Sequence, residues 1–140
     1  MFAELSLSTA MVIVTVLFHA TGLALLSHLL KVESRGEARL HPNPLTVAGV
    51  GFTLALVMGL FVLHGIEIWF YAIVYLLIDA VGDLRTAIYF STITYGAIGF
   101  SDVAMHEDWR LVAAIEGING ILLLGWSTAY FVTVVARVDR

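Results

Sequence analysis

Long runs of apolar residues alternate with short polar segments, and the runs are long enough to be membrane-spanning helices. The first run extends from about Ser8 to Leu30, the second over residues 45–78, and the third over residues 109–136. A helix that crosses ~30 Å of hydrocarbon needs roughly 20 predominantly apolar residues. Because hydrocarbon offers the backbone no water to bind, we predict helices for all three runs.

A polar linker over residues 31–44 separates the first two runs, and its Pro42 and Pro44 cannot continue a helix. The second run is long for one crossing at ~1.5 Å per residue. The stretch His64-Gly65-Ile66-Glu67 lies about two-thirds along it, where a helix reaches the opposite headgroups. The alternatives are one helix that tilts or projects beyond the bilayer and a change of direction near these residues.

A short helix is predicted over residues 84–95, between the second and third runs, with Asp83 as its N-cap. Its length of ~18 Å is too short to cross a bilayer. The predicted fold class is all-α transmembrane, with three spanning helices plus this re-entrant pore helix and a filter-like loop, residues 96–102. We divide the chain into residues 1–44, an N-terminal helix and cytoplasmic loop, and residues 45–140, a pore-loop module.

Composition supports a membrane protein, since 60% of the 140 residues are hydrophobic and only 13% are charged. Cysteine is absent, which excludes disulfides and thiolate metal sites. Nothing indicates nucleic-acid binding, and the N-terminus lacks the basic region of a secretory signal. Five of the 7 basic residues lie in the linker or at the C-terminus, which predicts an integral cell-membrane protein with its N-terminus outside and its C-terminus cytoplasmic. These residues are Lys31, Arg35, Arg39, Arg137 and Arg140.

The loop after the short helix reads Ala97-Ile98-Gly99-Phe100-Ser101-Asp102. With the helix before it and the flanking spans, it resembles the pore helix and selectivity filter of potassium channels, including small bacterial ion channels. In that family the filter reads Thr-Val-Gly-Tyr-Gly-Asp. The resemblance implies a homotetramer in which rings of backbone carbonyls from four loops replace the hydration shell of a cation.

Three positions depart from the family pattern and predict a degenerate filter. Ala97 removes the ring of hydroxyls that Thr supplies, and Phe100 lacks the Tyr hydroxyl. Ser101 replaces a Gly that adopts a positive φ, which costs a non-Gly residue ~1 kcal/mol. Asp102 matches the acidic residue of the family and is expected to attract cations. The transported ion, whether potassium, sodium or a divalent metal, stays open, and no other cofactor is expected.

Polar side chains inside the spans are candidates for a proton or metal relay, because an ionisable group is costly in a membrane. They are His19 in the first span and Glu116 with Asn119 in the third. The alternative role is structural: a neutral His19 with a partner on another helix, and a Glu116 that braces the filter through Thr92 or Thr94. Both interpretations stay open.

His64 and Glu67 are three residues apart, so they share one helix face. Their place near the interface favours a solvated pair, and the alternative is a pair that jointly holds a cation.

Three hypotheses for function follow. The first is a tetrameric cation channel with an altered filter, whose selectivity stays open. The second is a proton-coupled carrier of metal cations on the channel scaffold, and the third is a non-conducting structural or regulatory subunit. We do not expect an enzyme, because the sequence has no recognisable nucleophile arrangement, phosphate loop or cofactor motif.

Overall fold

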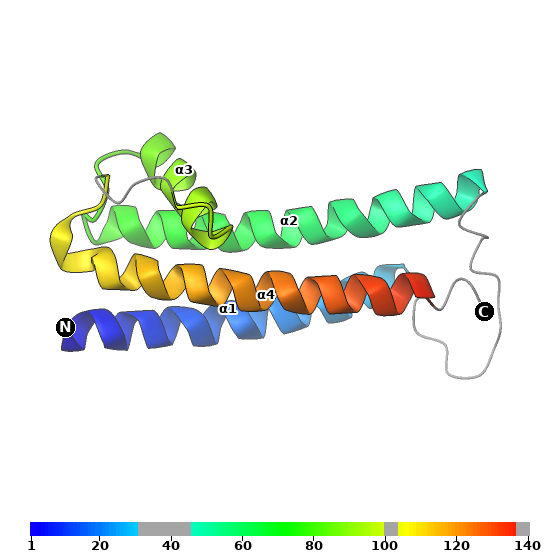
Figure 1. The fold of residues 1–140 in the computed structure, drawn as a ribbon, viewed down its shortest axis with the longest axis horizontal. Coiled ribbons are helices and arrows are strands. Elements are labelled where there is room, and N and C mark those ends of the chain that lie inside the picture. Colours follow the sequence, from blue (N-terminus) through cyan, green and yellow to red (C-terminus); the bar gives the residue numbers. More distant parts are fainter. Residues whose placement is uncertain (31–45, 100–103, 137–140) are drawn as a thin grey trace.

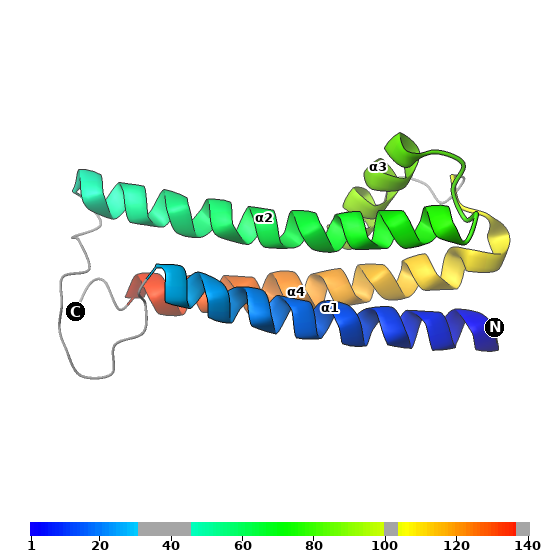
Figure 2. The ribbon, with the colours of Figure 1, turned by 180° about the vertical axis from the view of Figure 1, so that it is seen from behind.

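A computed structural model describes residues 1–30, 46–99 and 104–136. Three long helices, α1 (Phe2–Leu29), α2 (Val47–Leu77) and α4 (Arg110–Ala136), lie side by side, with α2 antiparallel to the other two (Figures 1 and 2). Each of the three is long and apolar enough to cross a membrane. For α4 this length includes the preceding 3-10 turn η1 (Glu107–Trp109). The described residues contain no strand, and the predicted all-α fold with three spans is confirmed.

The short helix α3 (Leu84–Tyr95) packs against α2 and α4 at the end of the bundle that holds the N-terminus (Figure 1). Asp83 caps it as predicted, accepting hydrogen bonds from the backbone N–H of Thr86 at 3.0 Å and from its hydroxyl at 2.6 Å. The last residue of α3 lies beside Gly120 of α4. Gly120 is ten residues from the start of α4, a depth of ~15 Å at 1.5 Å per residue. Helix α3 is therefore re-entrant and ends near the middle of the bundle.

Two glycines of α4 let the last turn of α3 lie directly on the α4 backbone. A Cβ at Gly120 would overlap the backbone carbonyl of Tyr95, and one at Gly117 would lie 3.3 Å from the carbonyl oxygen of Thr94. Any side chain at Gly120 would push the end of α3 away. These two glycines therefore fix the depth and position of the loop that follows α3.

The expected start of the first span was wrong, and the structure decides between the alternatives for the second. Helix α1 begins at Phe2 rather than Ser8, because the hydroxyls of Ser8 and Thr9 donate to the carbonyls of Glu4 and Leu5 and so fit within the helix. Helix α2 continues as one helix through residues 64–67, because His64 and Glu67 find partners inside the bundle. The sequence alone gave no sign of those partners.

Several predictions fall on residues outside the described ranges. They concern the linker with Lys31, Arg35 and Arg39, and the C-terminal Arg137 and Arg140. The filter positions Phe100, Ser101 and Asp102 also lie outside the described ranges.

Candidate functional site

Glu67 is the centre of a polar cluster inside the bundle, with only 1% of its surface exposed. Its Oε1 accepts a hydrogen bond from Nδ1 of His19 at 2.9 Å, and its Oε2 accepts one from the hydroxyl of Tyr95 at 2.5 Å. Nδ1 of His64 lies 3.2 Å from the same Oε2 and 2.9 Å from the Tyr95 oxygen. The cluster therefore joins α1, α2 and the last residue of α3.

The carboxylate of Glu67 determines how the two imidazoles are protonated, because an ionised carboxylate only accepts hydrogen bonds. Nδ1 of His19 donates to it, so Nε2 of His19 accepts from the hydroxyl of Ser127 on α4, 3.2 Å away. Nδ1 of His64 likewise donates, and its buried Nε2 has no hydrogen-bond partner among the described residues. His64 thus keeps an unused nitrogen inside the protein.

The expectation of a solvated His64 and Glu67 pair at the interface was wrong. Glu67 faces inward, where α1 and α3 supply its partners, and only 13% of the His64 side chain is exposed. One nitrogen or oxygen atom from each of His19, His64 and Glu67 lies within 4.8 Å of the other two. The structure thus brings together three residues that the sequence placed on two separate spans.

Glu116 lies in a second buried cluster, behind α3. It accepts hydrogen bonds from the hydroxyl of Ser91 at 2.5 Å and from the hydroxyl of Tyr75. Glu116 therefore does hold α3, but the expected partners Thr92 and Thr94 were wrong, since Ser91 donates instead and the exposed Thr92 hydroxyl donates to the carbonyl of Ile88. Ser91 instead faces α4, on the buried side of the short helix.

Asn119 forms a third contact, separate from Glu116 although the two are one helical turn apart. Its amide donates to the hydroxyls of Thr15 at 2.8 Å and of Tyr71 at 3.1 Å. These bonds tie α4 to α1 and α2. In the described chain, Asn119 therefore links helices of the bundle rather than reaching the loop.

The filter-like loop is described as far as Gly99. Residues 97–99 are exposed in the single chain, and their N–H groups all donate to carbonyls of the last turn of α3 at 2.8–3.1 Å. Ala97 and Gly99 have φ values of 54° and 56°. The sequence predicted backbone strain at Ser101. Among the described residues of the loop, the non-glycine residue with a positive φ is Ala97, and this conformation costs its backbone ~1 kcal/mol.

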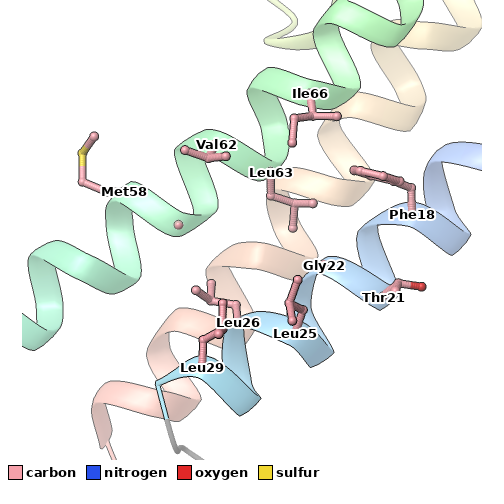
Figure 3. A pocket seen from close by; sticks show the side chains of 11 residues that line it. Phe18, Thr21, Gly22, Leu25, Leu26, Leu29, Met58, Val62, Leu63 and Ile66 are labelled. Atoms are coloured by element: carbon pink, nitrogen blue, oxygen red, sulfur yellow. The ribbon is translucent and has the colours of Figure 1, made fainter.

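An apolar groove of about 420 Å³ lies between α1 and α2 (Figure 3). Leu63 packs over Gly22 and Leu26 packs over Gly59, so these glycines allow close contact of the two helices. Phe18 and Ile66 line the groove next to the polar cluster, and its lining has no ionisable side chain. This groove therefore offers no charged side chain as a ligand.

Sequence reasoning missed the hydroxyl groups that complete these clusters. Four of them come from residues inside the apolar spans, and two from α3. The signal was present, because hydroxyls in an apolar run need partners, but the sequence does not show which helices meet. The missed residues are Thr15, Tyr71, Tyr75, Ser91, Tyr95 and Ser127.

Three spanning helices, a re-entrant helix and an exposed loop at mid-depth define a pore-loop membrane protein. A family model described as "Ion channel" matches residues 60–137, more than half of the chain. The chain therefore belongs to this potassium-channel-like ion-channel family. The matched part runs from the second half of α2 through α3 and α4, and it leaves α1 outside. No curated protein and no solved structure matches the chain.

Proposed function

We propose that the chain is the subunit of a tetrameric cation channel in which the loop over residues 96–102 forms the ion path. The observation that carries this proposal is the position of that loop. The loop follows a re-entrant helix that ends ~15 Å inside the bundle, and its described residues, 96–99, are exposed on a single chain. One loop cannot surround an ion, so a ring of ligands needs symmetry-related copies.

The hydrogen bonds of the loop suit a cation. The N–H groups of Ala97, Ile98 and Gly99 donate back into α3, so these positive groups are turned away from a passing ion. The C-terminal end of α3 also points into the bundle, and its dipole favours positive charge there. Carbonyl oxygens are then the natural ligands.

The altered filter leads us to propose weak discrimination between potassium and sodium. Ala97 has no hydroxyl to add to the ring of oxygens. Ala97 also adopts a positive φ, a backbone conformation that is strained for a residue with a side chain. With the predicted orientation, the end of the bundle that carries α3 is the outer one, and the C-terminus of α4 lies in the cytoplasm.

Cation flux into liposomes that contain the purified protein tests this function, with potassium, sodium and divalent metals compared with and without an inward proton gradient. A channel gives monovalent flux that does not need the gradient. Gly99→Ala should reduce that flux strongly, because residue 99 has a φ of 56°. Gly82→Ala, in open space before α3, is the matched control and should conduct like wild type. Absence of flux under every gradient would instead support a non-conducting subunit.

A proton-coupled metal carrier is the second candidate, favoured by the full burial of Glu116 at the junction of α2, α3 and α4. A buried carboxyl group inside a membrane is a typical proton carrier in coupled transport. In that case metal uptake requires the proton gradient, and Glu116→Gln abolishes uptake while the oligomer stays intact. Gradient-dependent uptake that survives in Glu116→Gln would rule out this residue as the carrier.

A further inference from the structure

We propose that His19, His64 and Glu67 form a binding site for a divalent transition metal of the Zn²⁺ class, and that metal bound there acts on the filter through Tyr95. The site lies inside the bundle and is separate from the loop carbonyls that we propose as the ion path. Its effect on flux rests on the proposed channel function, but metal binding itself does not.

The donor set is one that Zn²⁺ uses in proteins, two imidazole nitrogens with one carboxylate and a further open position. Ligands of a tetrahedral Zn²⁺ are ~3.3 Å apart, given metal–nitrogen distances of ~2.0–2.1 Å. Here Glu67 lies 2.9 Å from Nδ1 of His19 and 3.2 Å from Nδ1 of His64, and all three ligand atoms are within 4.8 Å of one another. Small side-chain rotations therefore close the site.

The surroundings also fit a metal. A histidine that binds a metal generally donates its other ring N–H to a neighbouring acceptor, and Ser127 lies 3.2 Å from Nε2 of His19 to accept it. The buried Nε2 of His64 has no partner among the described residues, so His64 also offers a second ring nitrogen that no protein group occupies. A cavity of about 300 Å³ between α2 and α4 is lined by both His64 and Ser127, which gives an ion a way in.

Tyr95 connects this site to the filter. It is the last residue of α3, directly before Gly96, and its hydroxyl bonds both Oε2 of Glu67 and Nδ1 of His64. A metal that takes these two atoms removes both partners of the hydroxyl. The end of the pore helix then loses its tie to α2, and the loop that follows loses its fixed position. Metal binding should therefore reduce flux.

Calorimetric titration of the detergent-purified full chain with Zn²⁺ tests binding. We expect one high-affinity Zn²⁺ per chain in wild type, and a loss of at least about tenfold in affinity for Glu67→Gln. The chain has 5 histidines. A variant with the other three replaced by Gln, at His28, His41 and His106, keeps only His19 and His64 and should bind like wild type. No binding by wild type, or equal binding by Glu67→Gln, would overturn the site.

Potassium flux with and without Zn²⁺ tests the action on the filter. Zn²⁺ should lower flux in wild type and in the variant that keeps only His19 and His64. Tyr95→Phe should still bind Zn²⁺, but Zn²⁺ should no longer change its flux, because the hydrogen bonds from residue 95 to Glu67 and His64 are already absent. If Glu67→Gln is inhibited as strongly as wild type, Zn²⁺ blocks elsewhere and the coupling is wrong. A protein without any flux would refute the channel proposal, while the titration would still decide the metal site.

Discussion

At the scale of single residues, the buried polar groups of this chain are arranged so that each carboxylate receives several donors. Glu67 accepts from His19 and Tyr95, and Glu116 accepts from Ser91 and Tyr75. Removing the donor of a buried acceptor lowers the free energy of unfolding by more than an average hydrogen bond contributes to it, because the acceptor has already been removed from water. Single substitutions that remove one donor should therefore have measurable effects.

Tyr95→Phe removes one hydroxyl and keeps the packed ring, so it isolates the bond to Glu67. We expect a loss of about 1–3 kcal/mol in stability, seen as a lower midpoint of thermal unfolding in detergent. Tyr89→Phe on the exposed face of the same helix is the control and should leave the midpoint nearly unchanged. Equal midpoints for both variants would show that the Tyr95 hydroxyl does not hold α3.

Part of the site was predictable from residue type. His19 and Glu116 stood out because ionisable groups are rare in apolar spans, and both are buried as members of polar clusters, whereas Glu67 was expected to be solvated and is also buried. Their partners were not predictable, because the register between α1 and α2 depends on packing at positions such as Gly22 and Gly59, and the register between α3 and α4 depends on Gly120. The choice of Thr92 instead of Ser91 as the partner of Glu116 was wrong because the sequence does not show which face of α3 meets α4. Neighbouring residues of a helix point ~100° apart.

At the scale of elements, α3 depends on how its two ends are fixed. Its first turn is capped by Asp83, and its last turn rests on Gly117 and Gly120 of α4. The bounds of α3 were predictable, because a cap and a polar break are local signals. Its contact with α4 was not, because glycines in a membrane helix indicate close packing without naming the partner.

Gly120→Ala should displace the end of α3, because the added methyl group overlaps the carbonyl of Tyr95. Overpacking of this kind costs about 1–3 kcal/mol, and flux should fall because the loop moves with α3. Gly125→Ala on the same helix meets nothing within 4 Å and should keep wild-type stability and flux. Thermal unfolding together with liposome flux measures both effects, and a conducting Gly120→Ala of wild-type stability would contradict the observed packing.

The cap at Asp83 gives α3 a dependence on pH. The hydroxyl and then the backbone N–H of Thr86 donate to the Asp83 carboxylate and hold its pKa below the ordinary value. A group with a lowered folded pKa stabilises fully above its unfolded pKa, ~4, and loses that contribution as the pH falls through the folded pKa.

Asp83→Ala should therefore lower the midpoint of thermal unfolding at pH 7, and the difference from wild type should shrink below about pH 4. Thermal unfolding at pH 7 and pH 3 measures this. Asp83→Asn, which retains a capping side chain without the charge, should lie between wild type and Asp83→Ala at pH 7. A difference that is the same at both pH values would show that the carboxylate charge plays no part.

At the scale of the whole molecule, many large apolar side chains of the three spanning helices are exposed on the single chain, as expected for surfaces that meet lipid or other copies. Residues 97–99 are exposed for a different reason in our proposal, since they face the symmetry axis of a tetramer. The sequence contains no cysteine, so a single introduced thiol reports on one position without background.

Ile98→Cys should give covalent dimers with a short bifunctional thiol cross-linker, because copies of this residue converge around the proposed axis. Leu17→Cys, on the exposed face of α1, is the control and should stay monomeric, because α1 lies outside the part of the chain that matches the channel family. Denaturing electrophoresis after reaction in liposomes separates the two results. Dimers with Leu17→Cys and none with Ile98→Cys would place α1 at the contact between copies and the loop away from it. A central ion path built from loops 96–102 would then be excluded.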